Sequence, residues 1–420
     1  MYSSKLQFFS LLFVALTFLH GNQWTRDPIG NALVAWLCAF IMIGIVIWFG
    51  KRSNSFIDRE LLLCKVYLFW LVVCIVRGLF IVENYWECKQ LVYGSLALSM
   101  PLFVYYFKEP LVLSMTLQKW NMWMIPLFWI LGVWRCPLGG YSFMLTPFLL
   151  YGCFFIYLPK KWKLFVGTCL IIMLIGALDA RSQVIKAAAT ILCAVAFYFS
   201  YFVNDKYLKI VHWVFYIAPI VLLILGISGT FNFFRDSVSP SNRGKYVQTR
   251  VVKGKVVEEH LDADTRTFIY EEVIRSAVKN NYVIWGRTPA RGNDSEAFGQ
   301  FYAEDLKSGK YERHSNELCH LNVFTWLGLV GMLLHCLIYL LASYRAVYYS
   351  NNQFVKYIGI MVAFNWALGW IENWTNFNIP NLTIWIMISI CLSSKFRSMN
   401  DIEFKFWFES LFMKFGRVPK

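Results

Sequence analysis

Apolar runs of roughly 15–22 residues follow one another along almost the whole chain, separated by short polar stretches. About 20 apolar residues in a helix cross the roughly 30 Å core of a bilayer. The pattern therefore predicts an all-α polytopic membrane protein with about twelve transmembrane helices. The predicted spans cover residues 6–20, 32–50, 61–82, 91–107, 120–134, 141–158, 164–178, 184–203, 211–227, 318–344, 354–370 and 377–392.

The first apolar run, residues 6–20, has two interpretations. It is either a first span or the apolar core of a cleaved signal peptide. Both interpretations place residues 22–30 on the outer side of the membrane. The predicted topology of the remaining chain therefore does not depend on this choice.

One polar segment, residues 228–317, is too long to be a simple turn between spans. It divides the chain into four predicted parts. These are an N-terminal transmembrane bundle at 1–227, a partly helical outer loop at 228–317 between the ninth and tenth spans, C-terminal transmembrane helices at 318–394 and an amphipathic tail at 395–420.

Two stretches of the outer loop have helical periodicity. Residues 262–280, "DADTRTFIYEEVIRSAVKN", predict an amphipathic helix with Asp264 as its N-cap. Its apolar face is predicted to consist of Tyr270, Ile274, Ala277 and Val278. Residues 295–309 predict a second, shorter helix, and the aromatic tail at 401–415 predicts a helix that lies on the inner leaflet.

The charges indicate which side each loop occupies. The chain is 58% hydrophobic and 15% charged, and its formal net charge is +15. Lys and Arg gather in alternate loops, at residues 51–59, 108–119, 160–163, 206–209 and 345–356, whereas the other short loops hold scattered single cations. Cytoplasmic loops retain such cations, which places both termini inside and residues 228–317 outside. The same rule explains the basic charge, so we predict no nucleic-acid partner.

Two histidines stand where the outer loop enters the span that begins at residue 318. His314 and His320 are accompanied by Asn316 and Glu317. An imidazole titrates near neutral pH and suits a general base at the membrane surface, although an ordinary polar helix start has the same composition. Their i,i+6 spacing does not place both on one helical face and no HExxH motif occurs, so we predict no metal site.

Several cations lie at the outer ends of predicted helices. Arg181, Arg266, Arg77 and Lys186 are retained there against the charge rule for loops. They either extend to lipid headgroups and pair with neighbours, or they are functional, because charge near the membrane interior is expensive. A guanidinium binds phosphate oxygens in bidentate fashion. Two arginines and a histidine at one outer site would suit a phosphate-containing lipid.

Three motifs carry a resemblance to a known family. They are "LDARSQVIKAAATIL" at 178–192, "TRTFIYEEVIRSAVKNNYVIWGR" at 265–287 and "RHSNELCHLNVFTWLGLVG" at 313–331. In this order and on one side of the membrane, they resemble the bacterial O-antigen ligase and O-antigen polymerase superfamily of membrane glycosyltransferases. The likeness in motif begins near Leu178, and Ser315 interrupts the family's His-Asn pair.

The resemblance implies a donor glycan on undecaprenyl diphosphate at the periplasmic face of the bacterial inner membrane. His314, or alternatively His320, would take the proton of the acceptor hydroxyl. Arg181 and Arg266 would hold the diphosphate as it leaves. The donor is already activated, so neither a metal nor a cofactor is expected. Further candidates for this site are Arg77, Lys186, Arg287, Asn316 and Glu317.

The stretch "FNWALGWIENWTNFNIP" would face the same cavity, with sugar-binding residues at Trp370, Glu372, Asn373 and Trp374. An interfacial aromatic belt is the alternative for these residues. We expect polymerisation of lipid-linked repeat units, with glycan ligation to the lipid A core as the alternative. A transporter or flippase of lipid-linked sugars is the alternative from another class. Expected partners are the lipid-linked glycan, membrane lipid, and the pathway's chain-length regulator and flippase.

Overall fold

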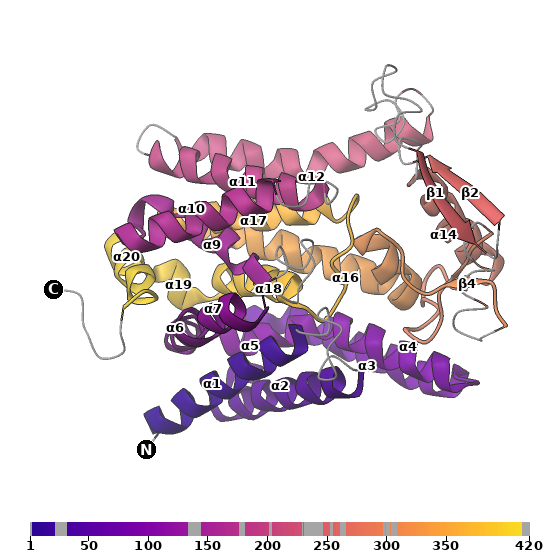
Figure 1. Ribbon diagram of the computed structural model, residues 1–420, viewed down its shortest axis with the longest axis horizontal. Helices are drawn as coiled ribbons and strands as arrows, with labels where there is room; N and C mark the ends of the chain where they lie inside the picture. Colours follow the sequence, from indigo (N-terminus) through magenta and orange to yellow (C-terminus); the bar gives the residue numbers. More distant parts are fainter. Residues whose placement is uncertain are drawn as a thin grey trace.

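The computed structural model describes residues 2–21, 32–132, 144–175, 181–200, 204–228, 230, 247–252, 255–260, 266–296, 299, 303 and 309–413. Helices make up most of these residues, and the strands are short. Figure 1 shows long helices side by side, with α20 at one end and α14 at the other. We call these the α20 end and the α14 end.

The N-terminal half is a series of packed helices. Its elements are α1 Tyr2–Gly21, α2 Ala32–Arg52, η3 Ser55–Ile57, η4 Arg59–Leu61, α3 Leu62–Ile81, α4 Tyr85–Leu98, η5 Met100–Phe103, α5 Val104–Phe107, α6 Pro110–Lys119, η6 Trp120–Met124, α7 Ile125–Leu127, η7 Phe128–Gly132, α9 Pro147–Cys153, η8 Phe155–Tyr157, α10 Lys160–Ile175, α11 Arg181–Tyr198 and α12 Asp205–Ile227.

The second half combines a small cap with three further long helices and a docked tail. Its elements are β1 Val247–Val252, β2 Lys255–His260, α14 Thr267–Lys279, β3 Asn293–Asp294, β4 Glu312–Arg313, α16 Cys319–Tyr349, α17 Gln353–Leu368, α18 Ile379–Leu392, α19 Ser394–Ser398 and α20 Asp401–Ser410. Strands β1 and β2 pair antiparallel from Val247 opposite His260 to Val252 opposite Lys255. We did not predict this hairpin.

The chain is an all-α membrane protein, but the described residues do not support the predicted count of twelve spans. Five helices are long and apolar enough to cross a membrane, and three apolar helices are shorter, at Lys5–His20, Ser182–Tyr198 and Ile379–Leu392. The five are Ala32–Arg52, Arg59–Ile81, Tyr85–Phe107, Asp205–Ile227 and Cys319–Tyr349. The polar segment therefore follows the fourth of these helices, not a ninth span.

Several predicted spans are shorter or more irregular than their hydropathy indicates. In the predicted span 120–134, two π-helical turns flank α7, which contains Pro126. Proline removes a backbone donor and disturbs the preceding turn. Helices α17 and α18 have 16 and 14 residues, about 24 and 21 Å. Every residue of α18 is buried, so its apolar composition serves contacts within the protein.

Helix α16 reverses direction at Gly328. The ring centroids of His320 and His335 are 6.2 Å apart, although 15 residues of straight helix span about 22 Å. Gly328 has φ 69° and ψ −173°, a conformation essentially restricted to glycine. The segment 319–327 therefore folds back beside the long part of α16, which brings the start of this helix into the protein.

The break in α16 is closed by the loop that follows α14. The amides of Arg287 and Thr288 donate to the carbonyls of Thr325 and Trp326, at 2.7 and 3.1 Å. In return, the amides of Leu329 and Val330 donate to the carbonyls of residues 283 and 284, at 2.8 and 3.4 Å. These four bonds replace bonds that an unbroken helix would make within itself. Gly286 crosses Gly328 at this point, where a Cβ on either residue would lie 2.4 Å from the other's amide nitrogen.

The predicted amphipathic helix of the outer loop is present, but its details differ. Helix α14 begins at Thr267 with Arg266 at the cap position, so Asp264, which lies outside the described residues, is not the N-cap. Its buried positions are Ile269, Val273, Ser276 and Ala277. Ile274 and Val278 are exposed, because the helix is rotated relative to the face we predicted. Most of the second predicted helix, 295–309, lies outside the described residues.

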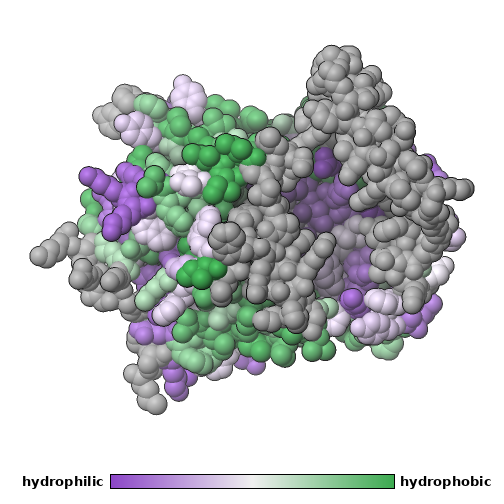
Figure 2. Space-filling model, in the orientation of Figure 1, coloured by the Kyte–Doolittle hydropathy of each residue, from purple (hydrophilic) through white to green (hydrophobic). Residues whose placement is uncertain are grey.

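The aromatic tail forms a helix, α20, and one face of this helix is covered by protein. Asn400 and Glu403 form a capping box at its start. Phe404 and Phe408 are fully buried in the bundle, and Trp407 Nε1 donates to the carbonyl of Pro110 at 3.0 Å. One face of α20 therefore packs on the helices, while Ile402 and Phe406 are exposed, and the predicted position on the inner leaflet stays a prediction. Figure 2 shows hydrophobic side chains over the middle of the described surface and hydrophilic ones toward both ends.

Candidate functional site

Helix α14 separates two cavities at one end of the molecule. On one side lies an apolar groove of about 810 Å³ between α11, α12, α14 and α17. On the other side lies a polar cleft of about 490 Å³ between α14, β3 and β4. Arg275 borders both cavities. An apolar space and a polar space that share a wall suit an amphipathic ligand.

The apolar groove has a hydrophobic floor and a polar rim. Phe215 and Leu222 of α12 and Phe364 of α17 contribute to the floor. Thr267 and Glu271 of α14 contribute to the rim. Tyr270, which also lines the groove, donates its hydroxyl to the carbonyl of Trp370 and so ties α14 to the segment after α17. Burial raises the pKa of Tyr270 well above its ordinary value, so its hydroxyl remains a donor.

A buried ion pair connects α11 to the segment after α17. Ile185 and Ile371 line the groove, and the residues that follow them, Lys186 and Glu372, form an ion pair at 2.9 Å. Their side chains are only 5% and 15% exposed. Lys186 Nζ also lies 5.5 Å from the ring centroid of Trp374. The structure thus brings together three of the predicted site residues, from α11 and from the segment after α17.

The two predicted diphosphate-binding arginines begin the helices that border the groove. Arg181 is the first residue of α11, and its side chain lies outside the described residues. Arg266 immediately precedes α14 and is next to the groove-lining Thr267. Each arginine therefore lies within a few residues, along the chain, of a side chain that lines the groove. Helix N-termini carry positive partial charge, so α11 and α14 add to the attraction for an anion.

His314 is enclosed by neighbouring residues. It is 7% exposed, and its Nε2 lies 2.8 Å from the carbonyl oxygen of Pro289, to which it donates. Its ring packs against Trp326 at 5.1 Å and faces Tyr93 at 6.5 Å. Burial lowers the pKa of His314 to about 4, so the ring is neutral near pH 7. A neutral imidazole is the form required of a base, but the low pKa weakens it.

His320, the alternative base, is also buried. Its Nε2 lies 2.9 Å from the carbonyl oxygen of Trp366, and its ring is 4.6 Å from that of Trp370. Cys336 Sγ approaches its Nδ1 at 3.8 Å. Neither His314 nor His320 is among the residues that line the apolar groove. His320 nevertheless contacts Trp370, which lines the groove. The side chain of Arg181 lies outside the described residues, so the predicted meeting of a histidine with Arg181 and Arg266 stays a prediction.

The backbone of Asn316 is held by the side chain of Asn322, and the side chain of Asn373 holds the backbone of Thr375. The backbone amide of Asn316 donates to Asn322 Oδ1 at 2.6 Å, and Asn322 Nδ2 donates to the backbone carbonyl of Asn316 at 2.9 Å. Asn373 Oδ1 accepts from the amide of Thr375 at 2.8 Å. Buried backbone outside helices requires such partners. Glu317 is exposed and pairs with Arg313 at 3.5 Å.

Arg77 and Arg287 bind protein groups. Arg77 donates to the carbonyls of Trp285 and Gly286, at 2.7 and 3.3 Å, and so secures the loop that closes the break in α16. Arg287 donates to Asp294 Oδ1 at 2.7 Å and lies 2.9 Å from Glu312 Oε1. Both arginines thereby maintain the shape of the α14 end.

Several residues of these cavities were not predicted. Tyr270 was expected only as part of an apolar face, while Glu271, Arg275 and Glu312 were not singled out. Their only signal in the sequence is mixed charge, which is common on solvated surfaces. Comparison with known proteins finds no family model that matches the chain, and no curated protein or solved structure that is similar to it.

His314 offers a test that separates structure from chemistry. We expect His314→Gln to fold like the parent, because the amide nitrogen of Gln can donate to Pro289 as Nε2 does. If His314 is the general base of a glycosyl transfer, the rate of that transfer falls by a factor of about 10²–10⁴. His314→Ala loses the bond and destabilises the loop as well. A Gln variant with normal activity contradicts the role as base.

The same residue predicts a pH dependence of stability. The pKa of His314 falls from 6.5 to about 4 on folding, so the unfolded chain binds the proton more tightly. Its contribution is present above pH 6.5 and is lost as the pH falls toward 4, by at most about 3 kcal/mol. Melting temperatures between pH 7 and 4 should fall less steeply in His314→Gln than in the parent.

Proposed function

We propose that this protein is a metal-independent membrane glycosyltransferase whose donor is a glycan carried on a polyprenyl diphosphate, such as undecaprenyl diphosphate. The observation that carries the proposal is the apolar groove, together with the ion pair Lys186–Glu372 and Arg266, each of which is next in sequence to a residue that lines it. A groove with a hydrophobic floor suits an isoprenoid chain, and the cations suit a diphosphate.

The proposed reaction transfers the glycan with inversion. A base removes the proton of an acceptor hydroxyl, whose oxygen forms a bond to the anomeric carbon as the bond to the diphosphate breaks. Arg181, Arg266 and Lys186 stabilise the departing diphosphate. His314 remains the predicted base, and it would have to exchange its bond to Pro289 for the acceptor. Glu372 is a second candidate because it neighbours the groove.

Within this function, we propose polymerisation of lipid-linked repeat units at the periplasmic face of the bacterial inner membrane. The α14 end would face the periplasm, and the α20 end would face the cytoplasm with both termini. Ligation to the lipid A core is the alternative, since it uses the same donor head. Trp370 and Trp374 are proposed to contact sugars, although both are engaged with other side chains.

The deciding experiment supplies purified protein in lipid nanodiscs with a polyprenyl-diphosphate-linked repeat unit and follows the products on a gel. Chain growth with release of polyprenyl diphosphate supports a polymerase. Growth only when lipid A core is added supports a ligase. With the same protein reconstituted into sealed vesicles, movement of the labelled glycan across the bilayer without a new glycosidic bond supports a flippase and contradicts the proposal. Arg266→Ala and Arg181→Ala should each reduce transfer strongly.

The groove makes a separate prediction about the lipid. Leu223 of α12 lines it, whereas the next residue, Ile224, is exposed and is not among its lining residues. We expect Leu223→Trp to fill the groove and to raise the KM for the lipid-linked donor by about tenfold or more. Ile224→Trp, on the same helix, should have little effect. Equal KM values for the two variants would exclude this groove as the lipid site.

A further inference from the structure

The polar cleft beyond α14 contains a balanced set of charges. Its lining includes the carboxylates Glu272, Asp294, Glu296 and Glu312. The lining cations are Arg275, Lys279 and Lys310, and Arg287 joins them by binding both Asp294 and Glu312. The partners of these residues add Arg291 on Glu312, and Glu83 and Glu87 on Lys310, which makes six carboxylates and five cations. The opposite charges therefore nearly cancel, and the set does not strongly favour an anionic or a cationic ligand.

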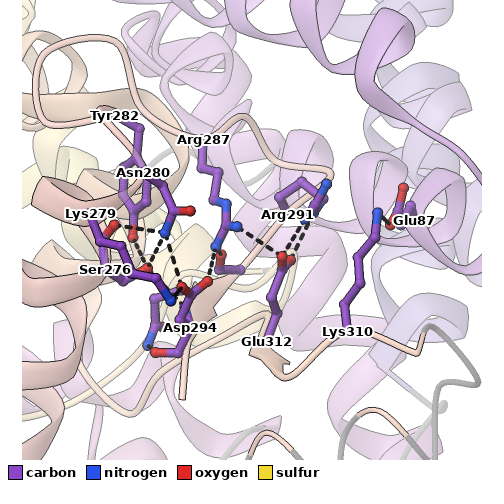
Figure 3. A network of polar contacts seen from close by, with 12 residues as sticks. Glu87, Ser276, Lys279, Asn280, Tyr282, Arg287, Arg291, Asp294, Lys310 and Glu312 are labelled. Carbon is purple, nitrogen blue, oxygen red and sulfur yellow. Dashed lines mark hydrogen bonds and ion pairs between the residues drawn. The ribbon is translucent and has the colours of Figure 1, made fainter. Parts of the chain in front are cut away.

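The charged groups are already held by one another, as Figure 3 shows. Asp294 binds Arg287, Lys279 and the amide of Asn280, and Glu312 binds Arg291 and Arg287. Burial would raise the pKa of Asp294, but the bonds from Asn280 and Arg287 outweigh it and lower this pKa. Asp294 is therefore ionised at neutral pH, and its partners hold it in place.

A network of this kind still offers hydrogen bonds to a ligand. A carboxylate accepts about four hydrogen bonds and an ammonium donates three. Lys279 is well exposed, and its ammonium donates to Asp294 at 3.1 Å among the described residues. Glu296 is also exposed, and Tyr311 places an aromatic ring at the cleft with 62% of the residue exposed. A neutral sugar has polar hydroxyls and apolar ring faces. Side chains that form hydrogen bonds beside an aromatic ring are therefore suited to bind it.

We propose that this polar cleft binds a neutral, hydroxyl-rich saccharide, and that it is the acceptor-glycan site of the transferase. The second clause rests on the proposed function. The shared wall at Arg275 places a glycan in the cleft next to the head of a lipid in the apolar groove. Lys279 and Tyr311 are the binding residues, and Arg287, Asp294 and Glu312 position the wall.

The test measures binding of lipid-free glycans, so it does not depend on activity. The intact protein in nanodiscs is exposed to an array of neutral and anionic bacterial oligosaccharides. We expect the parent to bind neutral glycans, and Lys279→Ala and Tyr311→Ala each to weaken this binding by about tenfold. Tyr311→Trp should retain it. Tyr207→Ala is the matched control, because Tyr207 is also 62% exposed but lies at the start of α12, away from the cleft.

The outcomes distinguish this inference from the proposed function. No binding of any neutral glycan, a preference for anionic glycans, or equal loss in Tyr207→Ala overturns the saccharide site. Transfer by a protein whose KM for the acceptor is unchanged in Lys279→Ala and Tyr311→Ala also overturns it, while the transferase proposal stands. Binding that needs the cleft, without any transfer activity, retains the saccharide site and removes the transferase.

Discussion

Replacing Gly328 with alanine is expected to abolish stable folding of the α14 end. A Cβ at this position would lie 2.2 Å from the carbonyl oxygen of Ile284 and 2.4 Å from the amide nitrogen of Gly286. The backbone angles of Gly328 alone disfavour alanine by about 1–3 kcal/mol. Relief of the clash would separate the loop from α16 and leave buried backbone groups unpaired, which adds to this amount.

The measurement is the yield of monodisperse protein and its melting temperature in detergent. Gly44→Ala is the matched control, because nothing lies within 4 Å of a Cβ at this position in α2. That variant should be neutral or more stable by up to about 1 kcal/mol. If Gly328→Ala melts like Gly44→Ala, the reversal of α16 is not present in the folded protein.

Replacing Lys186 with methionine is expected to destabilise the protein by about 3–5 kcal/mol. The change removes the ion-pair partner of Glu372 at 2.9 Å and leaves a carboxylate that is 15% exposed without its cation. The double variant Lys186→Met/Glu372→Leu should recover most of this loss, because neither charge remains buried. Chemical denaturation of the parent, Lys186→Met, Glu372→Leu and the double variant measures the interaction energy.

Transfer activity then distinguishes support from chemistry. If Lys186 and Glu372 act on the donor, the double variant is stable and inactive. If the pair only supports the fold, stability and activity recover together. Lys356→Met is the control, because its partner Asp205 is much more exposed than Glu372 and the expected loss is smaller. An equally large loss in Lys356→Met would contradict the burial argument.

The sequence predicted the features that depend on composition and short-range periodicity. The apolar runs identify a membrane protein, and the helix near residues 267–279 follows from the helical spacing of its apolar residues among charged ones. Cations at Arg266 and Lys186 were selected because charge beside apolar runs is costly; each is next in sequence to a residue that lines the groove, and their role at a site stays a prediction. The first two inferences are confirmed because burial of side chains in lipid or protein follows directly from residue type.

Other features depend on contacts between distant segments. Hydropathy did not reveal that α17 and α18 are short and largely buried, because a helix surrounded by protein is as apolar as one that faces lipid. The roles of Arg77 and His314 as donors to loop carbonyls required the loop at residues 285–289 to be in place. Their residue types fit catalysis and structural support equally well.

By itself, the sequence determined that this chain is a helical membrane protein with cations at the predicted outer ends of several helices. Only the tertiary structure decided that α16 reverses at Gly328, that α14 separates an apolar groove from a polar cleft, and that Lys186 meets Glu372. The physical reason is that hydrophobic burial is nondirectional and visible in composition. Hydrogen bonds and ion pairs require particular atoms within about 3 Å, which distant segments achieve only on folding.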